Sequence, residues 1–237
     1  EAGNLVLTTD ANQNSVSYTY DAEGRMISMT DGMGNTWRYE YDRNGRLVRT
    51  TDPMGGVVST AYDKVGRTDS VTDANGGITT YVYDGVGNTT SVKDALGKST
   101  KNVYDANGNL ISATDRNGDT TQYKYDKNNR LTRVTDALGG VTSYTYDALG
   151  QVTKTVSPAG NETAAVYDNM GRTTSSVNAR GFATRYEYDI LGRVTTMTNP
   201  DETTVSYTYD ANGQILTATN ELGDVTSYTY DANGNQA

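Results

Sequence analysis

The stretch YTYDANGQILTAT, residues Tyr207 to Thr219, contains a Tyr-Asp dyad followed by a glycine three positions after the aspartate. The same dyad recurs every 21 residues, at eleven positions from Tyr20-Asp21 to Tyr230-Asp231, with no insertion or deletion. A fixed period of this length is typical of a repeat protein, in which each unit contacts mainly its neighbours. We therefore predict that residues 1–237 form a single array of about eleven 21-residue repeats, truncated at both ends as a fragment of a longer protein.

Three columns define the repeat: the dyad tyrosine, the dyad aspartate and the glycine that follows, which Asn129 replaces in one copy. We interpret these residues as structural. They are Tyr20, Asp21, Gly24, Tyr41, Asp42, Gly45, Tyr62, Asp63, Gly66, Tyr83, Asp84, Gly87, Tyr104, Asp105, Gly108, Tyr125, Asp126, Tyr146, Asp147, Gly150, Tyr167, Asp168, Gly171, Tyr188, Asp189, Gly192, Tyr209, Asp210, Gly213, Tyr230, Asp231 and Gly234.

A second turn signal begins ten residues after each dyad aspartate from Asp21 to Asp210, where Asp, Asn or Ser stands and a glycine usually follows three residues later. Asp, Asn or Ser at the first position and Gly at the fourth favour a type I turn, with the glycine forming the bulge of a three-residue hairpin loop. The segments between turns, such as VTSYTY from Val141, are rich in strand-forming residues. The sequence thus predicts an all-β fold: a continuous antiparallel β-meander with two strands per repeat. Strand twist should coil so long a meander into a spiral or shell-like ribbon, because open sheets rarely exceed ~10 strands without curling.

The tyrosines predict which side chains share a face of the ribbon. Of the 19 tyrosines, eleven belong to the dyads and eight lie two residues earlier, at Tyr18, Tyr39, Tyr81, Tyr123, Tyr144, Tyr186, Tyr207 and Tyr228. Residues two apart in a strand point to the same face, so neighbouring repeats should form two aromatic columns. A bulge in each first turn would pair the dyad tyrosine with the position two after the glycine, as in Leu47, Leu110 and Leu131.

Charge and composition narrow the function classes. The net charge is −9, and the Lys and Arg residues are scattered, which argues against nucleic-acid binding. No apolar run approaches the ~20 residues of a membrane span. The chain has no His and no Cys, so it lacks the usual nucleophile-base pairs and zinc ligands. We predict no enzyme activity, no catalytic or metal site and no cofactor. The arginine that often follows the first-turn glycine, as at Arg25 and Arg46, is expected to reach a turn carboxylate.

The stretch YDANGNLISATDRNGDTTQYKYD, Tyr104 to Asp126, resembles the Rhs or YD repeat, and the resemblance extends over essentially the whole chain. That family includes bacterial Rhs and wall-associated polymorphic toxin proteins, the B and C components of toxin complexes, and the teneurins. The resemblance implies a non-catalytic segment in the wall of an encapsulating shell that sequesters a toxin or other polypeptide. It also implies a secreted or cell-surface parent protein, and the remainder of the parent chain as the partner.

Two other interpretations stay open at this point. Asp-rich turns such as DRNGD from Asp115 resemble the start of a calcium loop, but the glycine comes two residues too early and no Glu follows at the twelfth position. Turn capping is therefore favoured over weak cation binding.

Exposed tyrosine columns would instead suit an extracellular carbohydrate-binding or adhesion module. Trp37 and Phe182 break the pattern of their columns and are interpreted as local packing. Unpaired strands at the ends of the segment would favour end-to-end self-association.

Overall fold

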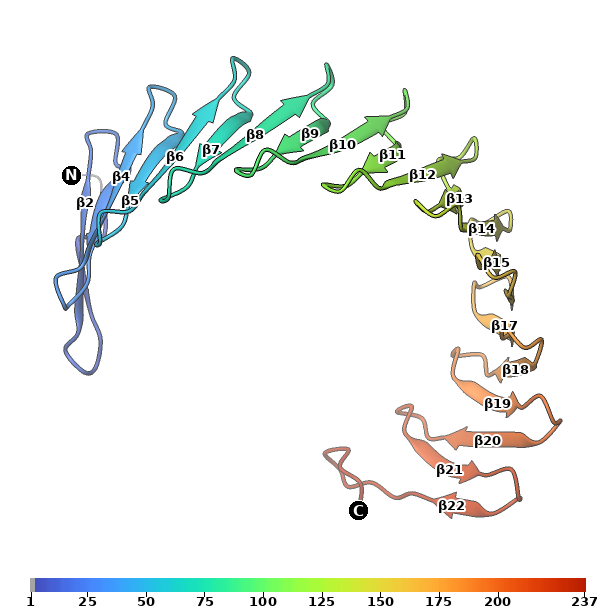
Figure 1. Ribbon diagram of the computed structural model, residues 1–237. Helices are drawn as coiled ribbons and strands as arrows, with labels where there is room; N and C mark the ends of the chain where they lie inside the picture. The colour runs from blue at the N-terminus through green and yellow to red at the C-terminus, as the bar shows by residue number, and fades with distance from the viewer. Residues whose placement is uncertain (1–2) are drawn as a thin grey trace. The chain divides into compact units, whose positions relative to one another are not determined.

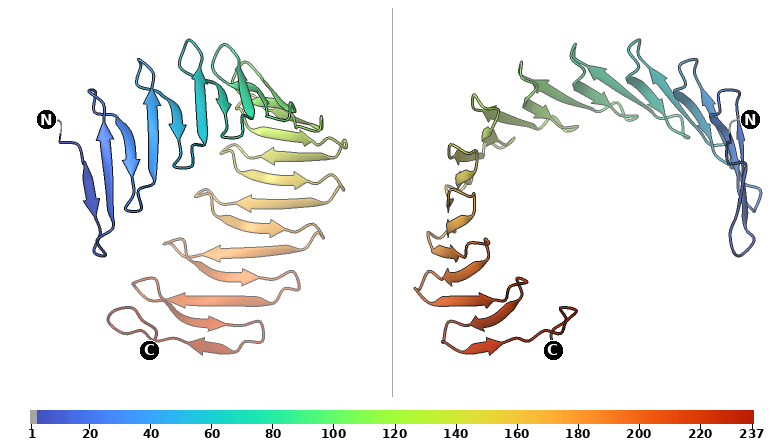
Figure 2. Two further views of the ribbon diagram at one scale, coloured as in Figure 1. Left: turned by 60° about the vertical axis from the view of Figure 1, so that its left-hand side comes forward. Right: turned by 180° about the vertical axis from the view of Figure 1, so that it is seen from behind.

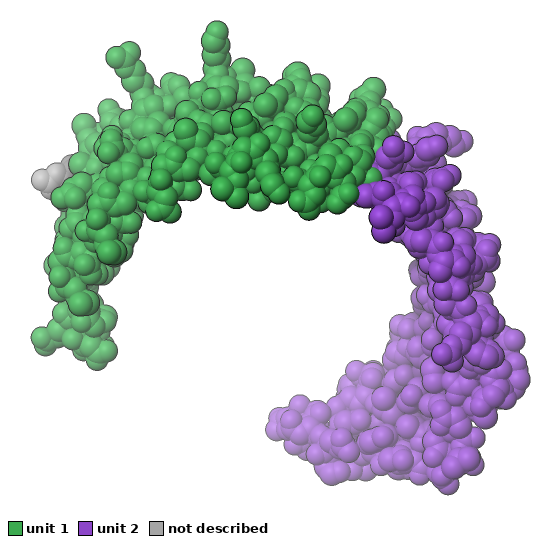
Figure 3. All heavy atoms as spheres, viewed as in Figure 1, with its two compact units in different colours: residues 1–120 green, residues 121–237 purple. Residues whose placement is uncertain are grey.

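A computed structural model describes residues 3–237 of the chain, which separates into two compact units, Glu1–Thr120 and Thr121–Ala237 (Figure 3). Each unit is an antiparallel meander in which the chain runs up and down through successive hairpins (Figures 1 and 2). The described residues contain strands and turns but no helix, and consequently none long enough to cross a membrane. The predicted all-β fold class is confirmed.

The first unit contains eleven strands, alternately five and six residues long after a short first strand. They are β1 (Leu7–Thr9), β2 (Ser15–Tyr20), β3 (Met26–Thr30), β4 (Thr36–Tyr41), β5 (Leu47–Thr51), β6 (Val57–Tyr62), β7 (Thr68–Thr72), β8 (Ile78–Tyr83), β9 (Thr89–Lys93), β10 (Ser99–Tyr104) and β11 (Leu110–Thr114). From β1 through β10, each strand pairs antiparallel with the next strand in the chain.

The second unit repeats the same order, with β12 beginning at the boundary between the units. Its strands are β12 (Thr120–Tyr125), β13 (Leu131–Thr135), β14 (Val141–Tyr146), β15 (Val152–Val156), β16 (Glu162–Tyr167), β17 (Thr173–Val177), β18 (Ala183–Tyr188), β19 (Val194–Thr198), β20 (Thr204–Tyr209), β21 (Ile215–Thr219) and β22 (Val225–Ser227). Again each strand pairs antiparallel with its sequence neighbour.

The turn that follows each dyad, called here the first turn, contains the predicted bulge. In β4 and β5 the pairs run Glu40 with Arg49 and then Tyr41 with Leu47, so one residue of β5 is skipped. The same shift pairs Tyr104 with Leu110 and Tyr125 with Leu131. The register expected from the bulge is confirmed, and it keeps both tyrosines of each Tyr-x-Tyr on one face.

The fourth residue of both kinds of turn has a left-handed backbone. Its φ is +79° at Gly45 in a first turn and +86° at Gly34 in a second turn, the turn that begins ten residues after the dyad aspartate. Glycine adopts this conformation without the steric cost that a Cβ atom imposes. Where the glycine column is interrupted, Gln13, Asn129 and Glu202 adopt the same conformation, with φ between +60° and +66°. Turn geometry is thus kept even where the preferred residue is lost.

Neither unit has an enclosed hydrophobic core, since no described residue is buried. Most domains bury an apolar face against a second layer, whereas each unit here is a single layer of strands. The dyad and outer tyrosines are half-buried, and the residue between them, such as Thr19 or Lys124, is exposed. The folded state must therefore be held mainly by backbone pairing and by contacts between neighbouring strands.

Candidate functional site: an Asp-Arg-Tyr ladder on the first-turn edge

The dyad aspartate caps the first turn through one carboxylate oxygen. In Asp42, Oδ1 accepts hydrogen bonds from the backbone N–H groups of Asn44 and Arg46, at 2.9 and 3.0 Å. The first turns of all eleven repeats make this pair of bonds, at closely similar distances. Such side-chain capping satisfies donors that a tight turn leaves without backbone partners.

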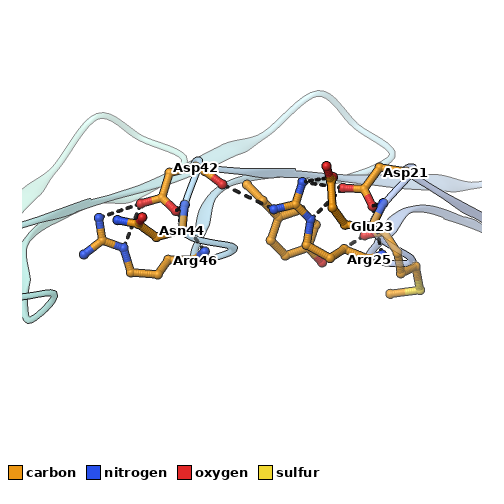
Figure 4. A network of polar contacts seen from close by, with 8 residues as sticks. Asp21, Glu23, Arg25, Asp42, Asn44 and Arg46 are labelled. Carbon is orange, nitrogen blue, oxygen red and sulfur yellow. Dashed lines mark hydrogen bonds and ion pairs between the residues drawn. The ribbon is translucent and has the colours of Figure 1, made fainter.

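The second carboxylate oxygen binds the residue that follows the turn glycine. In Asp42 it accepts a hydrogen bond from Nε of Arg46 at 2.7 Å and lies 2.6 Å from Nη2 (Figure 4). Six repeats have this arginine, and all six form the ion pair. The arginines are Arg25, Arg46, Arg67, Arg130, Arg172 and Arg193. The expected contact between arginine and turn carboxylate is confirmed, and these charge-assisted hydrogen bonds all end on Oδ2, because Oδ1 accepts from the backbone.

Each of these arginines also reaches the next repeat. The guanidinium carbon of Arg46 lies 4.5 Å from the centre of the Tyr62 ring, and the other five arginines lie 4.5 to 5.1 Å from the equivalent tyrosine. At this distance a cation is attracted to the face of the ring. Arg25 additionally donates a hydrogen bond from Nη1 to the backbone oxygen of Asp42, at 3.3 Å (Figure 4). One side chain thus connects the first turns of two successive repeats.

The dyad tyrosine connects repeats in the opposite direction. Its hydroxyl donates to a backbone carbonyl fifteen residues earlier: Tyr62 to Leu47 at 2.9 Å, and Tyr83 to Thr68 at 2.7 Å. Together, the capping aspartate, the arginine and the dyad tyrosine form what we call the ladder, repeated along the first-turn edge of each unit. In the six repeats that follow an arginine, both the ring and the hydroxyl of the dyad tyrosine make contacts within the protein.

The ladder keeps its aspartates ionised. The backbone N–H of Arg46 is the largest influence on Asp42, followed by the Arg46 side chain, and both lower the pKa of the Asp42 carboxyl below its ordinary value. At Asp168 the backbone N–H of Arg172 again contributes most to the lowered pKa, with partial desolvation opposing it. Hydrogen bonds to a carboxylate favour the charged form, so these groups stay negative into acid solution.

Where the arginine is absent, an amide takes over part of its function. Asn88 donates from its side chain to Oδ2 of Asp84 at 2.9 Å, within one repeat. Gln151 instead reaches the next repeat, donating to the backbone oxygen of Gly171 at 3.2 Å. The column after the turn glycine therefore accepts several side chains, provided that each supplies a donor at the turn edge.

Sequence reasoning placed the aspartate, arginine and tyrosine separately, but it missed their connection across repeats. It predicted two columns of rings, whereas the dyad column has guanidinium groups lying over six of its rings. The signal was present in the sequence, since an arginine at the position after the glycine always precedes a dyad tyrosine by 16 residues. Only the bulged register shows that this spacing brings the two side chains together.

Among residues 3–237, no three carboxylates are grouped so as to hold a metal ion. The dyad aspartates face backbone N–H groups and cations rather than one another. The ladder is therefore an arrangement for holding turns in place, with its charged groups paired inside and between repeats.

A family model for the RHS repeat matches seven stretches that together include most of the chain, namely residues 1–36, 24–57, 62–99, 104–133, 125–162, 167–204 and 209–237. The chain belongs to the RHS repeat family. No curated protein matches the sequence. The family match confirms the expected resemblance. In this chain, the contacts of the ladder connect successive RHS repeats.

Solved structures show the same fold in proteins of low sequence identity. A crystal structure of TcdB2-TccC3 has a TM-score of 0.61 at 19% identity and covers 99% of this chain. A Photorhabdus luminescens Tc holotoxin pore gives a TM-score of 0.59, and TcdB2-TccC3-TEV gives 0.60, both at 19% identity and covering 99% and 98% of this chain. The RHS repeat chain spans about 15% of the length of the chains it matches.

Proposed function

We propose that this RHS repeat chain is a structural, non-catalytic segment in the wall of an encapsulating shell that sequesters a toxin or other polypeptide cargo. The observation that carries the proposal is the regular pairing within each unit: every strand except those at the ends of a unit is hydrogen-bonded to a neighbour on both sides. A sheet so paired leaves no opening between strands for a polypeptide to pass. Membership in the RHS repeat family and the fold shared with TcdB2-TccC3 support it.

In this proposal the chain is one segment of a longer parent protein that is exported or displayed on the cell surface. The partner of the chain is the remainder of that parent protein. The similar structures have chains several times longer, which is consistent with a wall built from many repeats. Containment needs no reactive side chain, and the ladder accordingly engages its aspartates, arginines and tyrosines in contacts within the wall. At the ends of the isolated segment, β1 and β22 would be free to associate end to end.

Limited proteolysis of the complete parent protein tests the containment. We expect the cargo region to resist a broad-specificity protease under native conditions and to be digested once the wall is opened. Gly171→Pro should open it, because the glycine has a φ of +82° and its N–H donates to Asp168, neither of which proline allows. Met170→Ser, at an exposed turn position beside it, is the matched control and should leave the cargo protected.

Two results would contradict the proposal: a cargo region digested as fast in the unaltered parent as in the glycine variant, or specific glycan binding by the chain. Glycan binding would have to use the outer tyrosines, because the dyad hydroxyls and many dyad rings are occupied in the ladder. A glycan array repeated with Tyr144→Ala and Tyr186→Ala therefore separates the adhesion interpretation from the wall interpretation.

A further inference from the structure

The second turns of three successive repeats in the second unit line an open groove of about 650 Å³. These turns begin at Asn178, Asn199 and Asn220, in a column that is aspartate from Asp10 to Asp136. Small ligands and anchoring side chains occupy sites of about 300 to 1,000 Å³, so the groove is large enough to receive part of a partner. Its lining includes the one phenylalanine of the chain and two carboxylates.

Phe182 forms the aromatic part of the lining. In two second turns of the first unit the residue at this position is an asparagine whose amide donates to the turn carboxylate: Asn14 to Asp10 at 2.9 Å and Asn35 to Asp31 at 2.8 Å. Phe182 has no side-chain donor, and it binds Asn178 through its backbone alone: its N–H donates to Asn178 Oδ1 and its carbonyl accepts from the Asn178 N–H. Phe182 as a residue is 52% exposed, and with Pro200 and the 88% exposed Leu222 it gives the groove an apolar wall. Local packing does not account for so exposed an aromatic ring.

Two carboxylates complete the groove, Asp201 and Glu221. Asp201 accepts hydrogen bonds from the hydroxyl and the backbone N–H of Thr203, at 2.6 and 3.1 Å. The Thr203 hydroxyl contributes most to lowering the pKa of Asp201, so this carboxyl is ionised at neutral pH. Glu221 accepts a hydrogen bond from the Asn199 amide at 3.3 Å, which fixes it across the space between two turns.

No lysine or arginine lines this groove in the described part of the chain. Arg185, which extends to the same edge, is paired with Glu202. The groove therefore presents an aromatic ring and unpaired negative charge side by side. The ladder on the opposite edge combines the same groups, a carboxylate and a ring, and there an arginine binds both.

We propose that the groove binds a basic, apolar segment of another polypeptide. An arginine or lysine of that segment meets the carboxylates of Asp201 and Glu221, and a neighbouring apolar side chain packs on Phe182 and Leu222. Charge complementarity selects this partner over acidic or nucleic-acid ligands, since a groove with two carboxylates and no cation repels anions. The interaction goes beyond the wall function and can be measured on the isolated chain.

The single phenylalanine of the chain allows a direct test. Incorporation of 4-fluorophenylalanine gives one ¹⁹F resonance, which reports on the groove alone. We expect a capped peptide of alternating leucine and arginine to shift this resonance in a saturable manner. A peptide of alternating leucine and glutamate, and one of alternating serine and arginine, should shift it weakly or not at all.

Isosteric variants separate binding from folding. The double variant Asp201→Asn, Glu221→Gln keeps the acceptor atoms for Thr203 and Asn199 but removes both charges, and should weaken peptide binding by about tenfold. Asp69→Asn, Glu187→Gln removes the same charge from exposed positions outside the groove and should bind as the unaltered chain does. An unmoved resonance, equal binding of the acidic peptide, or undiminished binding by the groove double variant would each overturn the proposal. A shift produced by chitotriose instead of the basic peptide would replace the occupant with a saccharide.

Discussion

At the scale of single residues, the two tyrosines of each Tyr-x-Tyr sequence have different functions although they share a face. The hydroxyl of Tyr83 donates to the Thr68 carbonyl, and Arg67 lies over its ring. Tyr81 sits opposite Val92 on the adjacent strand, and its hydroxyl makes no hydrogen bond to the described residues. The dyad tyrosine is therefore both a packing group and a donor, while the outer tyrosine contributes mainly its ring.

This difference predicts unequal effects of removing a hydroxyl. Tyr83→Phe should lower the free energy of unfolding by about 0.5 to 1.5 kcal/mol, because the Thr68 carbonyl loses its donor. Tyr81→Phe, the matched control two residues away, should have little effect. Thermal unfolding followed by circular dichroism measures both, and equal melting temperatures for the two variants would show that the hydroxyl contact contributes nothing.

At the scale of the structural element, the first turn is stabilised by a carboxylate that must be charged. The unfolded-state pKa of an aspartate is about 3.9, and contacts with Arg46 lower the folded-state pKa of Asp42. A group whose pKa is lower in the folded state stabilises folding above its unfolded pKa. That contribution is lost as the pH falls through the folded pKa. Nine dyad aspartates have a lowered pKa, so acid should destabilise the chain as a whole.

The variant Asp42→Asn isolates this contribution in one turn. The amide still accepts the two backbone N–H bonds but cannot pair with Arg46, so the variant should melt below the unaltered chain at neutral pH. The gap should narrow as the pH falls below about 4 and through the lowered folded-state pKa of Asp42, because the wild-type carboxyl then becomes neutral as well. Asp69→Asn, at an exposed position without a hydrogen bond to the described residues, is the control. A gap for Asp42→Asn that is constant across this range would rule out charge as the cause.

At the scale of the whole molecule, stability comes from contacts between successive repeats, because no described residue is buried. The stability of a repeat protein is approximately the sum of the intrinsic stabilities of its repeats and the free energies of the interfaces between neighbouring repeats. For the stability of such an array, keeping the two-strand period intact matters more than the number of residues removed. Removing two consecutive strands leaves the first turns of the remaining repeats on the same edge of the sheet. Removing one strand reverses the direction of every strand that follows, so the later first turns lie on the opposite edge.

Two internal deletions test this dependence on phase. Deleting residues 63–83 removes 21 residues and joins Tyr62 to Asp84, so a complete dyad is restored. Deleting residues 63–72 removes only ten but moves the following first turns to the opposite edge, which separates Arg46 and Tyr62 from the turns that continue their ladder. We expect the longer deletion to preserve cooperative unfolding near the wild-type melting temperature and the shorter one to lower it. The reverse order would contradict a ladder that depends on repeat phase.

The sequence alone determined the fold class, the period, the positions of the turns and the register of the bulge. These follow from local chemistry: Asp-x-x-Gly specifies a turn within four residues, and the pairing of Tyr41 with Leu47 follows from the loop length. The capping of Asp42 by its own turn was predictable for the same reason. The family was also recognisable, because the repeated dyad is a long and regular signal.

Only the tertiary structure decided which residues of different repeats touch. Arg46 and Tyr62 are 16 residues apart, and the sequence gives no reason to join them until the bulge sets the strands' relative positions. The exposure of Phe182 in a groove of three turns was likewise invisible, because it depends on neighbours 21 and 42 residues apart in the chain. Local patterns fix a hairpin because its contacts lie within a few residues. Contacts between hairpins depend on the summed geometry of turns and strands between them, which no single motif encodes.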